Sequence, residues 1–135
     1  MRPAALALAV AALLELARAN ARDQPAPLSA WTIAQAIGSD PTYLAKVLTL
    51  LAAAGLVTSR SGPGGGFFIG RSPDRITLAD VVMAIESPEE LTGQSFAPLD
   101  QRTARRLATA ITSARNARLR SLRRVNLLRL IEKQA

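Results

Sequence analysis

The pattern of hydrophobic and polar residues begins with an Ala- and Leu-rich run that predicts a helix over about residues 3–19. Pro3 suits the first turn of such a helix, and several of the leucines fit one packed face. The apolar run is too short to span a bilayer, and Glu15 interrupts it. A secretory signal is the alternative, since Arg2 precedes the run and a small-residue stretch follows at 17–19.

Two short helices are predicted after a loop over 20–27 that contains Asn, Asp and two prolines. Ser29 is a good N-cap for the first helix, and Gly38 ends it. Ser39 or Asp40 then caps the second, whose first residue is a proline. Two helices only a few residues apart are typical of a helix-turn-helix.

The second of these helices, over 41–54, separates into an apolar and a polar side. The apolar side, at three- and four-residue steps, consists of Leu44, Val47, Leu48 and Leu51. The side predicted to face solvent consists of Thr42, Tyr43, Lys46 and Thr49. A recognition helix places polar side chains near its start against base edges in the major groove. An ordinary solvated face is the alternative.

A wing is predicted directly after this helix. Strand-like residues at 56–59 and 67–69 flank the glycine-rich stretch 62–66, which allows a tight hairpin and a close approach of backbone to phosphate. A nucleotide-binding loop is the rival interpretation. It fits less well, because the Gly-Lys-Ser/Thr ending of a P-loop is missing and a strand follows instead of a helix.

The chain divides into three parts. Residues 1–88 form the winged helix-turn-helix, including a fourth helix capped by Thr77 that a Ser-Pro pair stops. Residues 89–98 are interpreted as a mobile linker. Residues 99–135 form a long helix and then a short terminal one over 127–133, which we expect to fold back onto the domain.

The long helix carries an apolar stripe that is too thin to stabilise an isolated helix in water, so it should pack against something. A second copy is the natural candidate, because DNA readers of this kind commonly use twofold symmetry. The stripe consists of Ala104, Leu107, Ala108, Ile111, Ala114, Leu119 and Leu122. Arg115 and Arg118 project from the same side and spoil a clean heptad seam. A basic arm lying on DNA or on an anionic membrane surface is the alternative.

Composition argues against enzyme chemistry. The chain has no Cys and no His, which excludes thiol nucleophiles, imidazole bases, zinc fingers and thiolate-held clusters formed by its own residues. We therefore expect no metal and no cofactor. Isolated carboxylates such as Asp80 and Glu86 fit helix caps or surface positions better than catalysis, so we expect no enzyme.

The net charge of +7 is distributed unevenly. Residues 1–98 contain seven Lys or Arg against eight Asp or Glu, whereas residues 99–135 contain ten against two. A phosphate-binding surface needs local positive charge. If the winged part binds DNA, it must do so with a small set of cations: Lys46, Arg60, Arg71 and Arg75.

Four segments together resemble the Rrf2 family of bacterial winged-helix transcription factors: Ser29–Gly38, Pro41–Val57, Ser61–Gly70 and Ile76–Pro88. The specific part is the glycine-rich wing followed at a fixed distance by a Thr-Leu-Ala-Asp helix. Phe67 stands where the family usually has Tyr. Cluster-binding members hold iron–sulfur through cysteines between the fourth helix and the dimer helix, and this chain has none there.

The resemblance implies a homodimer on a palindromic operator, with the third helix in the major groove, the wing near the minor groove and the long helix crossing the partner. The residues that it places on DNA are Ser29, Ser39, Thr42, Tyr43 and Lys46, with Arg60, Ser61, Gly64 and Gly65 in the wing. The helical pattern adds Thr49.

The predicted fold class is mainly α with a small β-wing, a winged helix-turn-helix plus a long carboxy-terminal dimerisation helix. The predicted function is a cytoplasmic bacterial transcriptional regulator, a repressor, that binds double-stranded DNA as a homodimer and does not sense through an iron–sulfur cluster. No membrane partner is expected, and an effector ligand or a protein partner would supply the signal. The alternative is a winged-helix adaptor that binds a protein partner with its basic carboxy-terminal helix.

Overall fold

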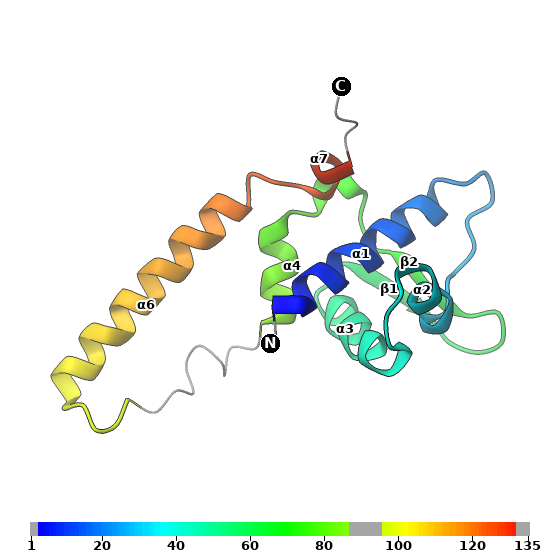
Figure 1. The fold of residues 1–135 in the computed structure, drawn as a ribbon. Coiled ribbons are helices and arrows are strands. Elements are labelled where there is room, and N and C mark those ends of the chain that lie inside the picture. The colour runs from blue at the N-terminus through cyan, green and yellow to red at the C-terminus, as the bar shows by residue number, and fades with distance from the viewer. Residues whose placement is uncertain (1–2, 87–95, 132–135) are drawn as a thin grey trace.

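The computed structural model describes residues 3–86 and 96–131. These residues are mainly helical, with one two-stranded antiparallel hairpin and a long helix near the carboxy end (Figure 1), which confirms the predicted fold class. In chain order the described elements are α1 (Pro3–Asn20), α2 (Ala30–Ile37), α3 (Pro41–Ala53), β1 (Val57–Arg60), β2 (Gly66–Ile69), η1 (Pro73–Arg75), α4 (Leu78–Ile85), α6 (Gln101–Leu122) and α7 (Leu127–Ile131).

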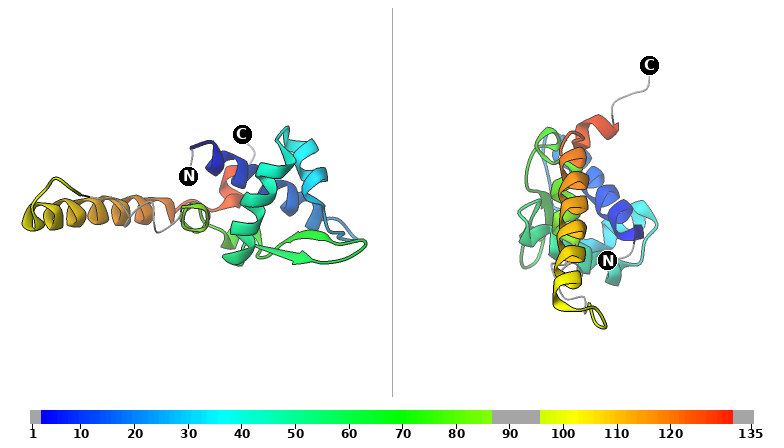
Figure 2. Two further views of the ribbon diagram at one scale, coloured as in Figure 1. Left: turned by 90° about the horizontal axis from the view of Figure 1, so that it is seen from below. Right: turned by 90° about the vertical axis from the view of Figure 1, so that its left-hand side faces the viewer.

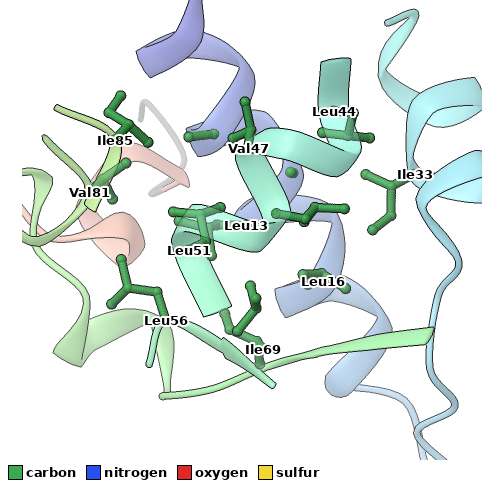
Figure 3. Packing of buried hydrophobic residues seen from close by; sticks show 14 of the residues in the cluster. Leu13, Leu16, Ile33, Leu44, Val47, Leu51, Leu56, Ile69, Val81 and Ile85 are labelled. Atoms are coloured by element: carbon green, nitrogen blue, oxygen red, sulfur yellow. The ribbon is translucent and has the colours of Figure 1, made fainter. Parts of the chain in front are cut away.

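Helix α1 is part of the core. Its buried face consists largely of alanines, which let neighbouring helices approach closely, while Leu13 and Leu16 point into the space beside α3 (Figure 3). The other elements contribute Ile33, Leu44, Val47, Leu51, Leu56, Ile69, Val81 and Ile85. This burial fits the packed-helix interpretation of the first apolar run. Among the described helices, none combines the length and apolar character that crossing a membrane requires.

The starts of α2 and α3 are capped as the sequence predicts. The Ser29 hydroxyl accepts a hydrogen bond from the backbone N–H of Thr32 at 3.0 Å. Of the two candidate caps for α3, the structure uses Asp40, whose carboxylate accepts from the N–H of Tyr43 at 2.9 Å. Pro41 occupies the first turn, where its missing N–H removes no intrahelical hydrogen bond.

The hairpin begins and ends within one residue of its predicted position. Val57 lies opposite Ile69 and Arg60 opposite Gly66. Leu28 extends the pairing, because it exchanges two backbone hydrogen bonds with Phe67, at 2.8 and 3.0 Å. Sequence reasoning missed this bridge, since a single residue in a proline-containing loop has no strand periodicity. The bridge ties the segment before α2 to the wing.

A capping box begins α4. The Thr77 hydroxyl accepts from the N–H of Asp80 at 3.1 Å, and the Asp80 carboxylate accepts from the N–H of Thr77 at 2.9 Å. At the other end of the helix, Glu86 accepts a hydrogen bond from Arg118 of α6 at 2.6 Å. Both carboxylates therefore have the structural roles that the sequence favours.

Replacing Thr77 by Ala is expected to lower the free energy of unfolding by about 1 kcal/mol, because the cap to the Asp80 N–H is lost. Urea unfolding followed by circular dichroism would measure this. Thr112→Ala is the control, since Thr112 is exposed on α6 and should shift stability by less than about 0.5 kcal/mol. Equal unfolding midpoints for the two variants would contradict the role of the cap.

Within the described residues, helix α6 packs on the body near its carboxy end. Its first turn is capped by Asp100, and the hydrogen bond from the Thr103 N–H, at 2.9 Å, holds the pKa of the Asp100 carboxyl below its usual range. At the far end, Leu119 is 4% exposed and packs against Ala79 and Val82 of α4. Between these ends α6 projects away from the rest of the molecule as an arm (Figures 1 and 2).

The packing of α6 changes part of the predicted dimer stripe. Leu119 is buried within its own chain, and Leu122 packs against the same small cluster, because the last turns of α6 lie on α4. Both side chains therefore already pack within their own chain, whereas the sequence assigned them to the contact with a partner. The rest of the stripe is only partly covered or is exposed: Ala104, Leu107, Ala108, Ile111 and Ala114.

The terminal helix α7 folds back onto the domain as expected. The N–H of Leu127 donates to the carbonyl of Ile76 at 2.9 Å, and the N–H of Leu78 donates to the carbonyl of Val125 at 2.8 Å. Leu127 is fully buried. The predicted linker over 89–98 lies mostly in 87–95, outside the described residues.

Candidate nucleic-acid interface

The outer side of α3 presents the polar side chains that the sequence singles out. Thr42, Lys46 and Thr49 are exposed, at four- and three-residue steps, on the side away from the buried leucines. The Thr49 hydroxyl donates to the carbonyl of Ala45 at 2.9 Å, which still leaves its oxygen free to accept. Together they offer an ammonium group and two hydroxyls along one helical face.

Tyr43 is placed differently from the prediction. It is half-buried and packs against the hydrophobic core, so it faces solvent only in part. The reason is its position on the helical wheel, beside the buried Leu44 and Val47. Its ring supports the start of α3 as well as bordering the polar side.

The two predicted serines lie at helix starts and are engaged in local hydrogen bonds. Ser29 donates to the Thr32 hydroxyl at 2.9 Å, and Ser39 donates to the carbonyl of Asp40 at 3.2 Å. The Asp40 carboxylate occupies the amino end of α3. A phosphate is therefore disfavoured at that end, and a base edge that donates hydrogen bonds is the better fit.

The wing presents Arg60 and Ser61 at its exposed end. The Arg60 guanidinium lies 5.3 Å from the centre of the Phe68 ring, diagonally across the hairpin, which restricts its freedom. Gly64 is exposed, and Gly65 is packed so closely that a Cβ would overlap the carbonyl of Arg60. The turn is therefore compact and presents backbone rather than bulky side chains to a ligand.

Arg71 does not belong to this surface. Its guanidinium points back toward the body, 3.5 Å from the carbonyl of Ala54 and 3.7 Å from the Asp80 carboxylate. A cation at the carboxy end of α3 interacts favourably with the last carbonyls of the helix. Of the four cations that the sequence assigned to the winged part, this one links α3 to α4 instead.

Sequence reasoning missed one exposed aromatic residue. Trp31 is 63% exposed on the outer side of α2, opposite the buried Ile33. The pattern of α2 contains the signal, because Trp31 and Gln35 fall on the polar side of the helical wheel. Trp31 is the single Trp of the chain, so its fluorescence reports on this part of the domain.

An iron–sulfur cluster held by Cys or His ligands does not fit the residues of this chain. Among the described residues, no group of three or more Asp, Glu, His or Cys side chains is close enough to hold an ion. The whole chain contains neither Cys nor His, the residues that ligate iron–sulfur clusters.

The arrangement defines a class of protein. Helices α2 and α3 form a pair in which α3 has an exposed polar side, and the β1–β2 hairpin with its glycine-rich turn follows α3 (Figure 1). These are the parts of a winged helix-turn-helix, to which this chain adds the projecting helix α6.

The comparisons identify the family within this class. The profile of the Rrf2 family, described as an iron-dependent transcriptional regulator, matches residues 4–133. The chain belongs to this family, as the resemblance suggested.

The individual relatives that match this chain are transcriptional regulators too. The transcriptional regulator IscR of Aliivibrio salmonicida is 37% identical over 84 residues, covering 62% of this chain and 48% of the relative. The chain thus spans about half the length of the curated relatives it matches, which are transcriptional regulators and not enzymes.

Solved structures show the same fold. A regulator structure from Listeria innocua matches with a TM-score of 0.68 and 25% identity, over 98% of this chain and 86% of that one. The cysteine regulator CymR of Bacillus subtilis matches with a TM-score of 0.62 and 23% identity, over 96% and 95%.

Proposed function

We propose that this protein is a DNA-binding repressor of transcription that acts in the bacterial cytoplasm as a homodimer on a palindromic operator. The observation that carries the proposal is the exposed polar side of α3 in the same unit as a compact wing bearing Arg60. Lys46 and Arg60 are its principal cations. Repression follows most simply, because it requires only occupancy of DNA that the polymerase needs.

The homodimer is supported by the exposed middle of α6. Leu107 is 41% exposed, and Ile111 is only partly covered. Both lie on the middle of α6, which extends away from the other described elements (Figure 2). A second copy would cover the leucine and isoleucine.

Regulation by this chain is expected to proceed without an iron–sulfur cluster. Purified protein should lack the visible absorption of such a cluster, and iron and acid-labile sulfide assays should both read near zero, because no thiolate or imidazole ligand is present. Stoichiometric iron and sulfide in anaerobic preparations would contradict this. Without a cluster, the regulatory signal would come from an effector ligand, a protein partner or the expression level.

One experiment tests both the proposed function and the adaptor hypothesis. Footprinting on the protein's own promoter should reveal two protected half-sites related by a twofold axis. The near-neutral charge of residues 1–98 is the feature that favours an adaptor instead. Absence of any protected DNA at low salt would favour it further.

A further inference from the structure

Helix α6 carries a concentration of positive charge that its fold does not explain. Its 22 residues include six arginines and no acidic residue. Within the described residues only Arg118 forms an ion pair, with Glu86 of α4. Arg102, Arg105 and Arg106 crowd the first two turns, where like charges repel at three- and four-residue spacing and cations oppose the helix dipole. These arginines destabilise the isolated helix, so a role outside the chain is the better explanation.

Four of the six arginines, Arg102, Arg105, Arg106 and Arg120, lie away from the centre of the apolar stripe, whereas Arg115 and Arg118 project from its side. At about 100° per residue, Arg102, Arg105 and Arg120 lie on one side of α6, and Ile111 and Leu122 lie on the far side. A partner that covers Ile111 and its neighbours therefore leaves open the cationic face, which is the side of these three arginines, and Ala108 lies at the border of the two faces. In Figures 1 and 2 the arm also extends from the body on the side away from the hairpin, so the face is separate from the wing.

Small polar side chains line this face between its cationic ends. The open surface between Arg105 and Arg120 consists of small residues: Ala108, Thr109, Thr112, Ser113 and Asn116. It continues from Arg105 to Arg102 and Arg106. The Thr109 hydroxyl donates to the carbonyl of Arg105 at 2.9 Å, so it can only accept from a ligand. Thr112, Ser113 and Asn116 carry the hydroxyl and amide groups that can donate to phosphate oxygens beside the arginines.

The dimensions indicate an extended polyanion. Arg102 and Arg120 are eighteen residues apart on the helix, which corresponds to about 27 Å of axis. Each strand of duplex DNA carries a phosphate about every 3.4 Å, so about eight phosphates span this length. Small-molecule sites are enclosed and mostly apolar, whereas this face lies along the surface of one helix.

We propose that this cationic face of α6 binds the phosphate backbone of duplex DNA without reading its sequence, at a place separate from the recognition helix. The inference rests on the proposed function, because it adds a second contact with the same class of partner. It predicts two kinds of binding in one protein, one selective through α3 and one governed by salt through α6.

The test uses the full chain and a fluorescent duplex of scrambled sequence, with affinity measured by anisotropy across a potassium chloride series. Arg102→Gln with Arg105→Gln should make the plot of log affinity against log salt shallower by about 1.8, since each lost phosphate contact removes about 0.9. The matched control is Arg18→Gln with Arg22→Gln, which removes the same charge from exposed positions near the end of α1 and should leave the slope unchanged.

Two results would overturn the inference: an unchanged slope in the α6 variant, and an equal change of slope in the control. If the slope is unchanged, altered sedimentation of the α6 variant would assign the face to a protein contact. Loss of binding to phosphatidylglycerol vesicles with an unchanged slope would assign it to a membrane surface. Failure of the proposed function is distinguishable, because wild-type protein would then show no preference for its own promoter over the scrambled duplex.

Discussion

We expect the wild-type protein to sediment as a dimer and the variant with both Leu107 and Ile111 replaced by Asp to sediment as a monomer. The two side chains lie on the uncovered middle of α6, and carboxylates there would be buried without partners on association, which costs several kcal/mol. Sedimentation velocity at micromolar concentration measures the outcome. Operator binding should fall with it, because one half-site alone supplies only part of the contacts.

The matched control for this variant is Met83→Asp. Met83 is 41% exposed, as Leu107 is, but it lies on α4 rather than on the arm. We expect this variant to sediment as the wild type does. A monomeric wild type at micromolar concentration, or a dimer that survives both α6 substitutions, would overturn the assignment of the arm.

Lys46→Ala and Arg60→Ala are each expected to weaken operator binding by about 1–3 kcal/mol if the side chain reads a base. Lys46 is exposed on the polar side of α3, and Arg60 is held over Phe68 at the wing. Titrations can follow Trp31 fluorescence or anisotropy of labelled DNA. Where the side chain touches phosphate instead, the loss should be similar on operator and scrambled duplex, and the salt slope should fall by about 0.9.

The carboxy-terminal arginines provide the comparison for these two variants. Neutralising Arg120, Arg123 and Arg124 together should slow association and flatten the salt dependence without altering sequence preference, because they contribute long-range attraction. If Lys46→Ala and Arg60→Ala leave operator binding intact while this triple variant abolishes all DNA binding, the recognition-helix assignment is wrong. The adaptor hypothesis would then gain.

Local signals account for what sequence reasoning predicted well. Ser29, Asp40 and Thr77 each act within three residues of themselves, so their caps are visible in the sequence and appear in the structure. The hairpin follows from glycines between two strand-like segments, whereas its register was not predicted from the sequence. The caps and the hairpin depend on neighbours along the chain, which periodicity captures.

Contacts between residues far apart in the sequence decided the features that the sequence did not predict. The sequence by itself determined the winged helix-turn-helix, the polar side of α3, the long basic helix and the lack of cluster ligands. Only the tertiary structure placed Leu119 on α4, turned Arg71 toward the end of α3 and brought Leu28 beside Phe67. The physical reason is that each residue is compatible with several partners until packing brings distant segments together. Helical spacing shows which side of α6 is apolar, but not that its last turns are covered by the same chain.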